Sequence, residues 1–286
     1  MNLCFSTLGC TERSLEDIIS LAARYGTENL ELRGMSGSTD ISAIPEFFDE
    51  NIGNTKEMLL RAGISPAVLG TSCAFHSEKK LAAALDEGRR SITLAKKLGI
   101  PYIRVFGNKF GDDRMAATQR VIDGIGELCD FAAGSGVSVL LEVHGDFCNE
   151  AALSPIVCGL RDRENFGIIW DIAHSHADYG NDFQRFYDFI VPYTRHVHLK
   201  DFDSGTGKLV LPGRGDIPIV PIVKALLDGG FGSCFSLEWE RLWHPGLPPI
   251  EEALDSLIAL LSDAGLIRAG AYGHGKTMKK GDEQIL

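Results

Sequence analysis

The sequence predicts a single-domain (β/α)8 barrel, the TIM barrel, on three observations. Strand-like and helix-like runs alternate eight times along the 286 residues, at a spacing of about 33 residues. No shift in composition between these runs marks a domain boundary. Four consecutive strand-like runs end in a polar, chemically competent side chain, which is where this architecture carries its chemistry. Eight strand–helix units in about 250 residues are what the barrel requires.

The expected strands are short apolar runs, most of them bounded by glycine or by polar turn residues. They lie at 3–7, 28–34, 64–70, 101–107, 137–145, 165–174, around 196–201 and at 233–240. The expected helices follow them at 14–25, 52–62, 77–98, 114–133, 149–161, 182–191, 218–229 and 249–264. In the first helix, Ser14 with Asp17 just inside the first turn resembles an N-cap, and Gly26 ends the helix.

A doubly wound sheet could also hold eight strands. It would not, however, gather the last four strands around one axis. The barrel is therefore expected over residues 1–267. The polar, Gly/Lys-rich stretch 268–286 is expected to form a tail outside it.

Composition limits the class of protein. Hydrophobic residues make up 44% of the chain, enough for a sizeable core. No apolar run reaches the roughly 18 residues of a membrane span. The N-terminus MNLCFSTLGC lacks the basic region of a signal peptide. The seven dispersed cysteines contain no CxxC pair, so a reducing, cytoplasmic location is expected. A net charge of −11 argues against nucleic-acid and membrane partners.

The segment HVHLKD, residues 196–201, carries three functional side chains. Strand alternation places His196, His198 and Lys200 on one face. Each of these groups must be hydrogen-bonded or bind something if it faces a dry core. His196 is expected to be a hydrogen-bonded inner support. Lys200 is expected at the rim, where it either contacts substrate or neutralises nearby carboxylates.

Three other strands end in a carboxylate: Glu142 in VLLEVHG, Asp171 in GIIWDIAH and Glu238 in CFSLEWE. In a barrel, the C-terminal strand ends meet at one mouth, with alternate side chains pointing inward. Together with His198 they predict a site for one divalent metal ion. Oxygen-rich ligands favour Mn²⁺, Mg²⁺ or Co²⁺, with Zn²⁺ as a further candidate. Without a cation, so many like charges at one mouth would repel one another.

Period two predicts an outer layer of candidate substrate contacts above these ligands. His144 would lie above Glu142, and Glu240 above Glu238; the other members are Lys200 and Arg33. His174, three residues past Asp171, would sit where its strand leaves the barrel. His144 and His174 could equally form a hydrogen bond to a metal ligand and so fix its orientation.

The ordered set LLEVHG, WDIAHSH, HVHLKD, GRGDIPI and SLEWE resembles the sugar-phosphate isomerase/epimerase superfamily with the xylose isomerase-like barrel. That superfamily includes ketose 3-epimerases and inosose isomerases and dehydratases. The resemblance covers about residues 1–265. It implies that Glu142, Asp171, His198 and Glu238 bind one metal and that the two glutamates move a proton. It also implies that His174 contacts a substrate oxygen.

One position departs from the ketose epimerases, which carry an arginine six residues after the metal histidine. Ser204 stands there in this chain, and Arg214 in the loop PGRGD is a candidate to reach the same space. HLKD with Lys200, together with EWERLWHP, looks closer to inosose-type members.

These patterns predict a divalent-metal-dependent isomerase or epimerase of carbohydrate metabolism. It would act on a small sugar or keto-polyol through a metal-stabilised enediolate. The alternative is a dehydratase of the inosose or 3-dehydroshikimate type. Two weaker alternatives are a non-catalytic sugar-binding barrel and a nuclease resembling endonuclease IV, which would need several zinc ions and a basic groove. The substrate, its phosphorylation and the oligomeric state, a homo-oligomer included, stay open.

Overall fold

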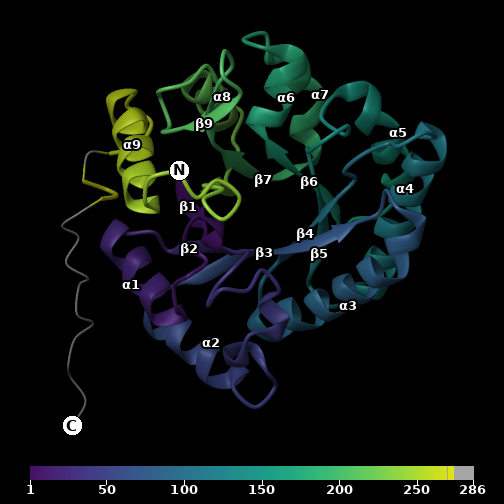
Figure 1. Cartoon of the computed structure of the whole chain (residues 1–286), viewed down its shortest axis with the longest axis horizontal. Helices are drawn as coiled ribbons and strands as arrows, with labels where there is room; N and C mark the ends of the chain where they lie inside the picture. Colours follow the sequence, from purple (N-terminus) through teal and green to yellow (C-terminus); the bar gives the residue numbers. More distant parts are fainter. Residues whose placement is uncertain (269, 274–286) are drawn as a thin grey trace.

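Eight parallel strands close into a barrel in the computed structural model, which describes residues 1–268 and 270–273 (Figure 1). Each strand is hydrogen-bonded to the next along the chain, and the last pairs with the first. They are β1 (Asn2–Ser6), β2 (Asn29–Leu32), β3 (Ser65–Ala74), β4 (Tyr102–Phe106), β5 (Ser138–Glu142), β6 (Phe166–Asp171), β7 (Thr194–Leu199) and β10 (Cys234–Leu237). The predicted (β/α)8 barrel is confirmed.

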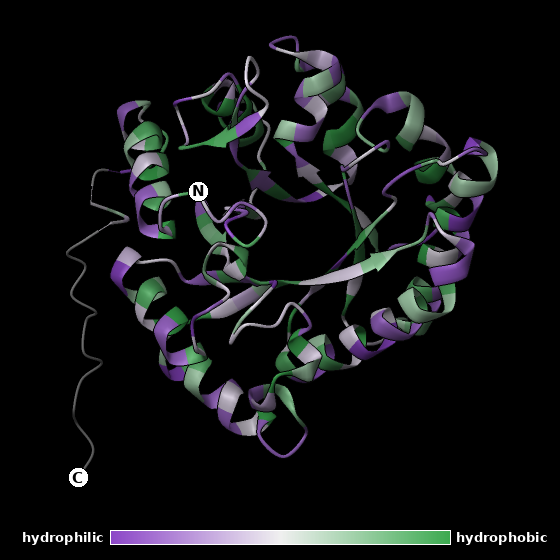
Figure 2. Ribbon diagram, viewed as in Figure 1, coloured by the Kyte–Doolittle hydropathy of each residue, from purple (hydrophilic) through white to green (hydrophobic). Residues whose placement is uncertain are grey.

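Helices surround the barrel in chain order (Figure 1). They are α1 (Leu15–Tyr25), α2 (Ile52–Arg61), α3 (Leu81–Leu98), α4 (Arg114–Phe131), α5 (Glu150–Leu160), α6 (Ile172–Tyr179), α7 (Gln184–Ile190), α8 (Ile219–Asp228) and α9 (Ile250–Asp263). Figure 2 shows hydrophobic and hydrophilic residues alternating in bands along them. This banding is expected of helices that bury one face on the barrel and expose the other.

The start of α1 shows how local sequence sets an element boundary. The Ser14 hydroxyl accepts a hydrogen bond from the Asp17 amide at 3.2 Å, and the Asp17 carboxylate reaches back to the Ser14 amide. This capping box satisfies two amide donors that the first turn leaves free. Gly26 ends the helix with a left-handed φ of 67°. The predicted N-cap and helix end are confirmed.

The structure differs from the expected elements after β6. The strand ends at Asp171 rather than at residue 174, and α6 begins at once. The cause is the Asp171 carboxylate, which accepts hydrogen bonds from the amides of Ala173 and His174 at 3.0 and 3.2 Å. It therefore caps α6. Between β7 and α8, around the glycine-rich loop 204–218, β8 (Asp201–Asp203) and β9 (Lys208–Val210) form an antiparallel hairpin that the sequence did not predict.

The interior of the barrel changes from apolar to charged along the strands. Near the N-terminal strand ends lies a small apolar cluster, which we call the lower plug. Cys4, Val68, Leu140 and Ile169 are fully buried in it, and Ala67 and Cys234 are almost fully buried. On β5 and β6, the next inward-facing residue after the plug is a predicted metal ligand, Glu142 or Asp171. After Cys234 on β10, the second inward-facing residue, Glu238, is one as well. The plug therefore forms the floor beneath the candidate site.

None of the helices in the described part of the chain is long and apolar enough to span a membrane. The predicted tail, 268–286, lies outside the described residues except for Arg268 and 270–273. The boundary at residue 267 stays a prediction.

Candidate active site

The four predicted metal ligands converge at the C-terminal mouth of the barrel. Glu142 ends β5, Asp171 ends β6, His198 lies within β7 and Glu238 directly follows β10. One potential ligand atom from each lies within 4.8 Å of the others, and all four side chains are buried. The fold thus brings together residues that are separated by up to 96 positions in the sequence.

The chemistry of this cluster suits a divalent cation. Three carboxylates and one imidazole form a hard-to-borderline donor set. In the described part of the chain, three buried atoms of the set lack a hydrogen bond of good geometry: Glu142 Oε2, Asp171 Oδ2 and His198 Nδ1. Two of them form ion pairs, Glu142 Oε2 with Arg104 at 3.0 Å and Asp171 Oδ2 with Lys200 at 2.7 Å, and His198 Nδ1 faces carboxylates at 3.4 Å or more. A bound cation would satisfy the converging lone pairs of these atoms. The residues present therefore fit the predicted metal.

Lys200 lies deeper than predicted. Its side chain is 1% exposed, so it is part of the buried cluster and not of the rim. Its ammonium lies 2.7 Å from Asp171 Oδ2, 2.7 Å from Glu238 Oε2 and 2.6 Å from Glu240 Oε1. Burial disfavours the charged amine, but Asp171 and Glu238 outweigh it and raise the pKa of Lys200 well above its usual value. Lys200 thus neutralises part of the carboxylate cluster, one of its two predicted roles.

Arg104, on β4, is a second buried cation that sequence reasoning missed. Its Nη1 lies 3.0 Å from Glu142 Oε2 and 3.2 Å from Glu238 Oε1. It therefore connects the two glutamates predicted to move the proton. An arginine inside the apolar run PYIRVFG was the available signal, because a charged residue inside a strand must be paired.

Glu31, on β2, fixes the orientation of His198. Its Oε2 accepts from Nε2 of His198 at 2.9 Å and from Nε2 of His196 at 3.2 Å. Because a carboxylate only accepts, both Nε2 atoms carry the proton. His198 Nδ1 is thereby left to face Glu238, Glu142 and Asp171 at 3.4 to 3.8 Å. His196 fits its expected role as an inner support, and Glu31 was not singled out from the sequence.

The charged groups in the cluster shift one another's pKa values. Burial opposes ionisation of Glu238, but His198 and Lys200 hold the pKa of this carboxyl well below its usual value. Burial likewise opposes charge on His198, yet Glu238 and Glu31 raise the pKa of the imidazole well above its ordinary value. Among the residues that the structure describes, the five carboxylates of the cluster, Glu31 and Glu240 included, form ion pairs with two permanent cations, Lys200 and Arg104. An additional positive charge would stabilise this cluster.

A cavity of about 250 Å³ opens beside the cluster. It is lined by Leu8, Arg33, Ser72, Ala74, Arg104, Phe106, Asn108, Glu142, His144, Glu238, Glu240 and Trp243. Of the predicted substrate contacts, Arg33, His144 and Glu240 therefore line it. Its volume lies below the roughly 300 Å³ at which pockets for drug-sized ligands begin, which suits a small molecule.

The remaining predicted contacts lie elsewhere. His174 stands in the first turn of α6, with its ring centroid 4.3 Å from that of His144. It borders the cluster, 3.9 Å from Asp171 Oδ2, but does not line the cavity. Arg214 is exposed in its loop and does not line the cavity either. Its predicted role is not supported by this position.

The glycine-rich loop is tied down by a carboxylate. Asp201 is fully buried and accepts from the amides of Gly213, Gly215 and Ile217 at 2.8 to 3.1 Å. These amides are therefore engaged within the chain. The segment GRGDIP closes the loop onto β8, and Gly215 lets the backbone approach: a Cβ at Gly215 would lie 2.3 Å from Asp201 Oδ1.

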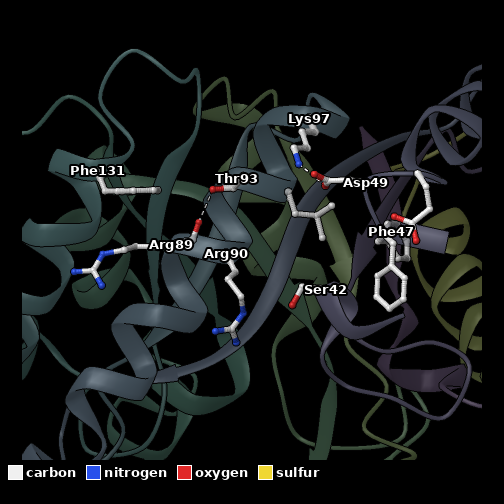
Figure 3. A pocket seen from close by; sticks show the side chains of 11 residues that line it. Ser42, Phe47, Asp49, Arg89, Arg90, Thr93, Lys97 and Phe131 are labelled. Atoms are coloured by element: carbon white, nitrogen blue, oxygen red, sulfur yellow. Dashed lines mark hydrogen bonds and ion pairs between the residues drawn. The ribbon is translucent and has the colours of Figure 1, made fainter. Parts of the chain in front are cut away.

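A larger cavity, of about 490 Å³, lies on the outer surface between the segment 42–50, α3 and the end of α4 (Figure 3). Its three cations are already paired: Arg89 with Asp86 and Glu127, Lys97 with Asp49, and Arg90 more loosely with Asp40 at 3.9 Å. Size alone would favour this pocket. We place the site at the barrel mouth because the convergent carboxylates and His198 lie there, beside a cavity.

Comparison with known proteins gives the family. The family model described as "Xylose isomerase-like TIM barrel" matches residues 19–260. The chain belongs to this family. The resemblance stated from the sequence is thereby confirmed.

Curated relatives are distant enzymes of two kinds. Fructoselysine 3-epimerase of Shigella flexneri is 21% identical over 189 residues, which cover 63% of this chain and 67% of that protein. Inosose dehydratase of Serratia proteamaculans (strain 568) is 27% identical over 169 residues, covering 52% and 56%. The matched segments thus span between about half and two thirds of these relatives.

Among solved structures, the IolI protein with a bound zinc atom superposes with a TM-score of 0.75 at 23% identity. The match covers 92% of this chain and 98% of that one. At this identity the likeness shows the fold.

Proposed function

We propose that this chain is a divalent-metal-dependent isomerase or epimerase of a small sugar or keto-polyol. One observation carries the proposal. Donors from four consecutive barrel strands converge beside a cavity, and only two of them, Glu142 and Glu238, also line that cavity. Asp171 and His198 would hold the metal without touching a bound molecule, whereas the two glutamates would do both.

The reaction is proton transfer next to a carbonyl. A divalent metal at this site, when bound, supplies Lewis acidity that makes the C–H beside a substrate carbonyl more acidic. One of the two glutamates takes that proton as general base, which converts the substrate to an enediolate. Return of a proton to the opposite face gives an epimer, and return to the neighbouring carbon gives an aldose–ketose isomer.

Glu142 is our choice for the base. Glu238 contacts two cations, Lys200 at 2.7 Å and Arg104 at 3.2 Å, and these weaken it as a proton acceptor. Glu142 contacts only Arg104 at this distance, at 3.0 Å. Arg104 lies between the two carboxylates and fixes their orientation relative to the cavity.

Dehydration is the second candidate. Expulsion of a β-hydroxyl from the same enediolate gives a lyase outcome without a change in the ligands. The match to an inosose dehydratase, at 27% identity over about half of the chain, favours keeping this candidate.

Exchange of substrate hydrogen with deuterium oxide tests the proposal. Wild-type protein loaded with Mn²⁺, Co²⁺ or Mg²⁺ would be screened with ketoses, keto-inositols and 3-dehydroshikimate. We expect exchange of the α-proton with at least one of them. Glu142→Gln should lower the exchange rate by about 10²- to 10⁴-fold, the usual contribution of a general base.

Two controls make the result decisive. Metal content must be measured in each variant, because Glu142 is also a proposed ligand. Glu57→Gln, on the exposed surface of α2, should exchange at the wild-type rate. Near-normal exchange by Glu142→Gln with metal bound would show that another group is the base. Absence of exchange by wild-type protein with every candidate would overturn the enediolate mechanism.

A further inference from the structure

Arg33 is a buried cation that has no counter-ion among the described residues. Its side chain follows β2, is 5% exposed and lines the 250 Å³ cavity. The other two cations of the site, Arg104 and Lys200, each contact at least two carboxylates. Within residues 1–268 and 270–273, Arg33 forms no ion pair. A buried guanidinium is normally paired, so this arrangement calls for an explanation.

The surrounding backbone is shaped to hold Arg33 in place. Its stem lies over Gly70 of β3, where a Cβ would come within 2.6 Å of Arg33 Cδ. Its Nη1 donates to the carbonyl of Thr39 at 2.8 Å, and its Nη2 donates to the Ser72 hydroxyl at 3.0 Å. These bonds use two of the five N–H donors of a guanidinium. Each terminal nitrogen keeps one further donor for a ligand.

The environment also disfavours an unpaired charge here. Burial, and then repulsion from Arg104, lower the pKa of Arg33 to about 10. The carboxylates of Glu87, Glu238 and Glu142 act in the opposite direction but lie beyond ion-pair distance. A bound anion would offset both the cost of burying the guanidinium and its repulsion from Arg104. It would supply the missing counter-charge in a poorly solvated place.

We propose that Arg33 and Ser72 form an anion-binding subsite, and that the substrate of this barrel carries a carboxylate or phosphate group there. The inference rests on the proposed function and narrows it to acidic or phosphorylated ketoses and keto-polyols. Glu142 and Glu238 line the same cavity, so one small molecule can reach both the anion subsite and the proton-transfer groups. Ser72 adds a hydroxyl donor or acceptor beside the guanidinium.

Titration calorimetry on the Mg²⁺-loaded full-length chain tests the subsite directly. The probes are inorganic phosphate and malonate, which distinguish a phosphate source from a carboxylate source. Wild-type protein should bind at least one of them roughly 10- to 100-fold more tightly than Arg33→Met, as expected for a charged hydrogen-bonded pair. Arg33→Lys, which keeps the charge but loses the planar fork, should fall between the two. Any binding of the anion to the metal is common to all three proteins and does not contribute to the difference.

The alternative is that Arg33 only braces residues 39 and 72. In that case Arg33→Met would lower the melting temperature but leave the affinity for both anions unchanged, and the proposal would fail. It would fail equally if wild-type protein bound neither anion. Failure of the enediolate mechanism gives a different result: anion binding that depends on Arg33, but no deuterium exchange with any substrate.

Discussion

The two ends of the barrel interior use the same strands for opposite purposes. Leu140 and Glu142 are neighbours on one face of β5, as are Ile169 and Asp171 on β6. The first member of each pair packs in the lower plug with other apolar side chains. The second belongs to the charged cluster at the mouth. Two residues along a strand, a distance of about 7 Å, therefore separate the apolar plug from the cluster of like charges at the mouth.

This difference indicates where stability and chemistry lie in the molecule. The plug removes apolar surface from water and leaves almost no polar atoms to satisfy. The mouth buries four carboxylates, beside the half-buried Glu240, and their mutual repulsion is only partly offset by Lys200 and Arg104. Substitutions in the plug should therefore reduce the free energy of unfolding with little effect on metal affinity. Substitutions around the mouth should do the reverse.

The largest effect is expected from Leu140→Ala in the plug. Leu140 is fully buried, so truncation removes apolar contacts and leaves a cavity. The expected loss is about 2–5 kcal/mol in the free energy of unfolding. Urea denaturation followed by circular dichroism measures it. Metal affinity, measured by calorimetry on the folded variant, should stay within about twofold of wild type, because the two sites share no partner.

Leu60→Ala is the matched control. Leu60 lies on α2 and is 76% exposed, so its truncation should change stability by no more than about 0.5 kcal/mol. An equal loss in the two variants would contradict the assignment of the plug as a stabilising floor.

A smaller effect, on metal affinity, is expected from Glu31→Gln. Glu31 lies between plug and mouth and accepts from both His196 and His198. A glutamine amide can accept from one imidazole but presents donors to the other, so His198 loses its fixed orientation. Removing such a partner of a metal histidine typically costs about 10- to 100-fold in metal affinity. Calorimetric titration with Mn²⁺ measures the change.

Glu28→Gln, at an exposed position just before β2, controls for the loss of one negative charge and should bind Mn²⁺ like wild type. Unchanged affinity in Glu31→Gln would show that Glu31 stabilises the fold without orienting His198.

The difference between the plug and the mouth also explains which features of the fold and the site could be predicted from the sequence alone. Strand and helix periods are local properties, so the eight units and their order could be predicted. The convergence of Glu142, Asp171, His198 and Glu238 could be predicted because they recur at or beside the C-terminal ends of four consecutive barrel strands. The depth of Lys200 could not be predicted, since alternation gives the face of a side chain but not how far a flexible stem reaches inward. Arg104 and Glu31 were missed because their roles depend on partners from other strands.

The start of α6 was missed for a related reason. The run GIIWDIAH reads as one apolar strand through residue 174. Its ending at Asp171 depends on a carboxylate that can both cap a helix and face the barrel axis. Residue type alone did not distinguish a ligand from a cap, and Asp171 is placed to serve as both.

The smallest effect is expected from Ile169→Val, and it tests most closely whether the plug and the mouth are independent. Ile169 is the plug residue two positions before Asp171 and is fully buried. Ile169→Val removes one methylene and should lower the free energy of unfolding by about 0.5–1.5 kcal/mol. If plug and mouth are independent, Mn²⁺ affinity should not change measurably, even though the two residues lie on the same face of one strand. A fall in affinity comparable to that of Glu31→Gln would mean that packing beneath Asp171 sets the position of its carboxylate. The floor would then be part of the metal site, and the division between stability and chemistry would have to be placed lower in the barrel.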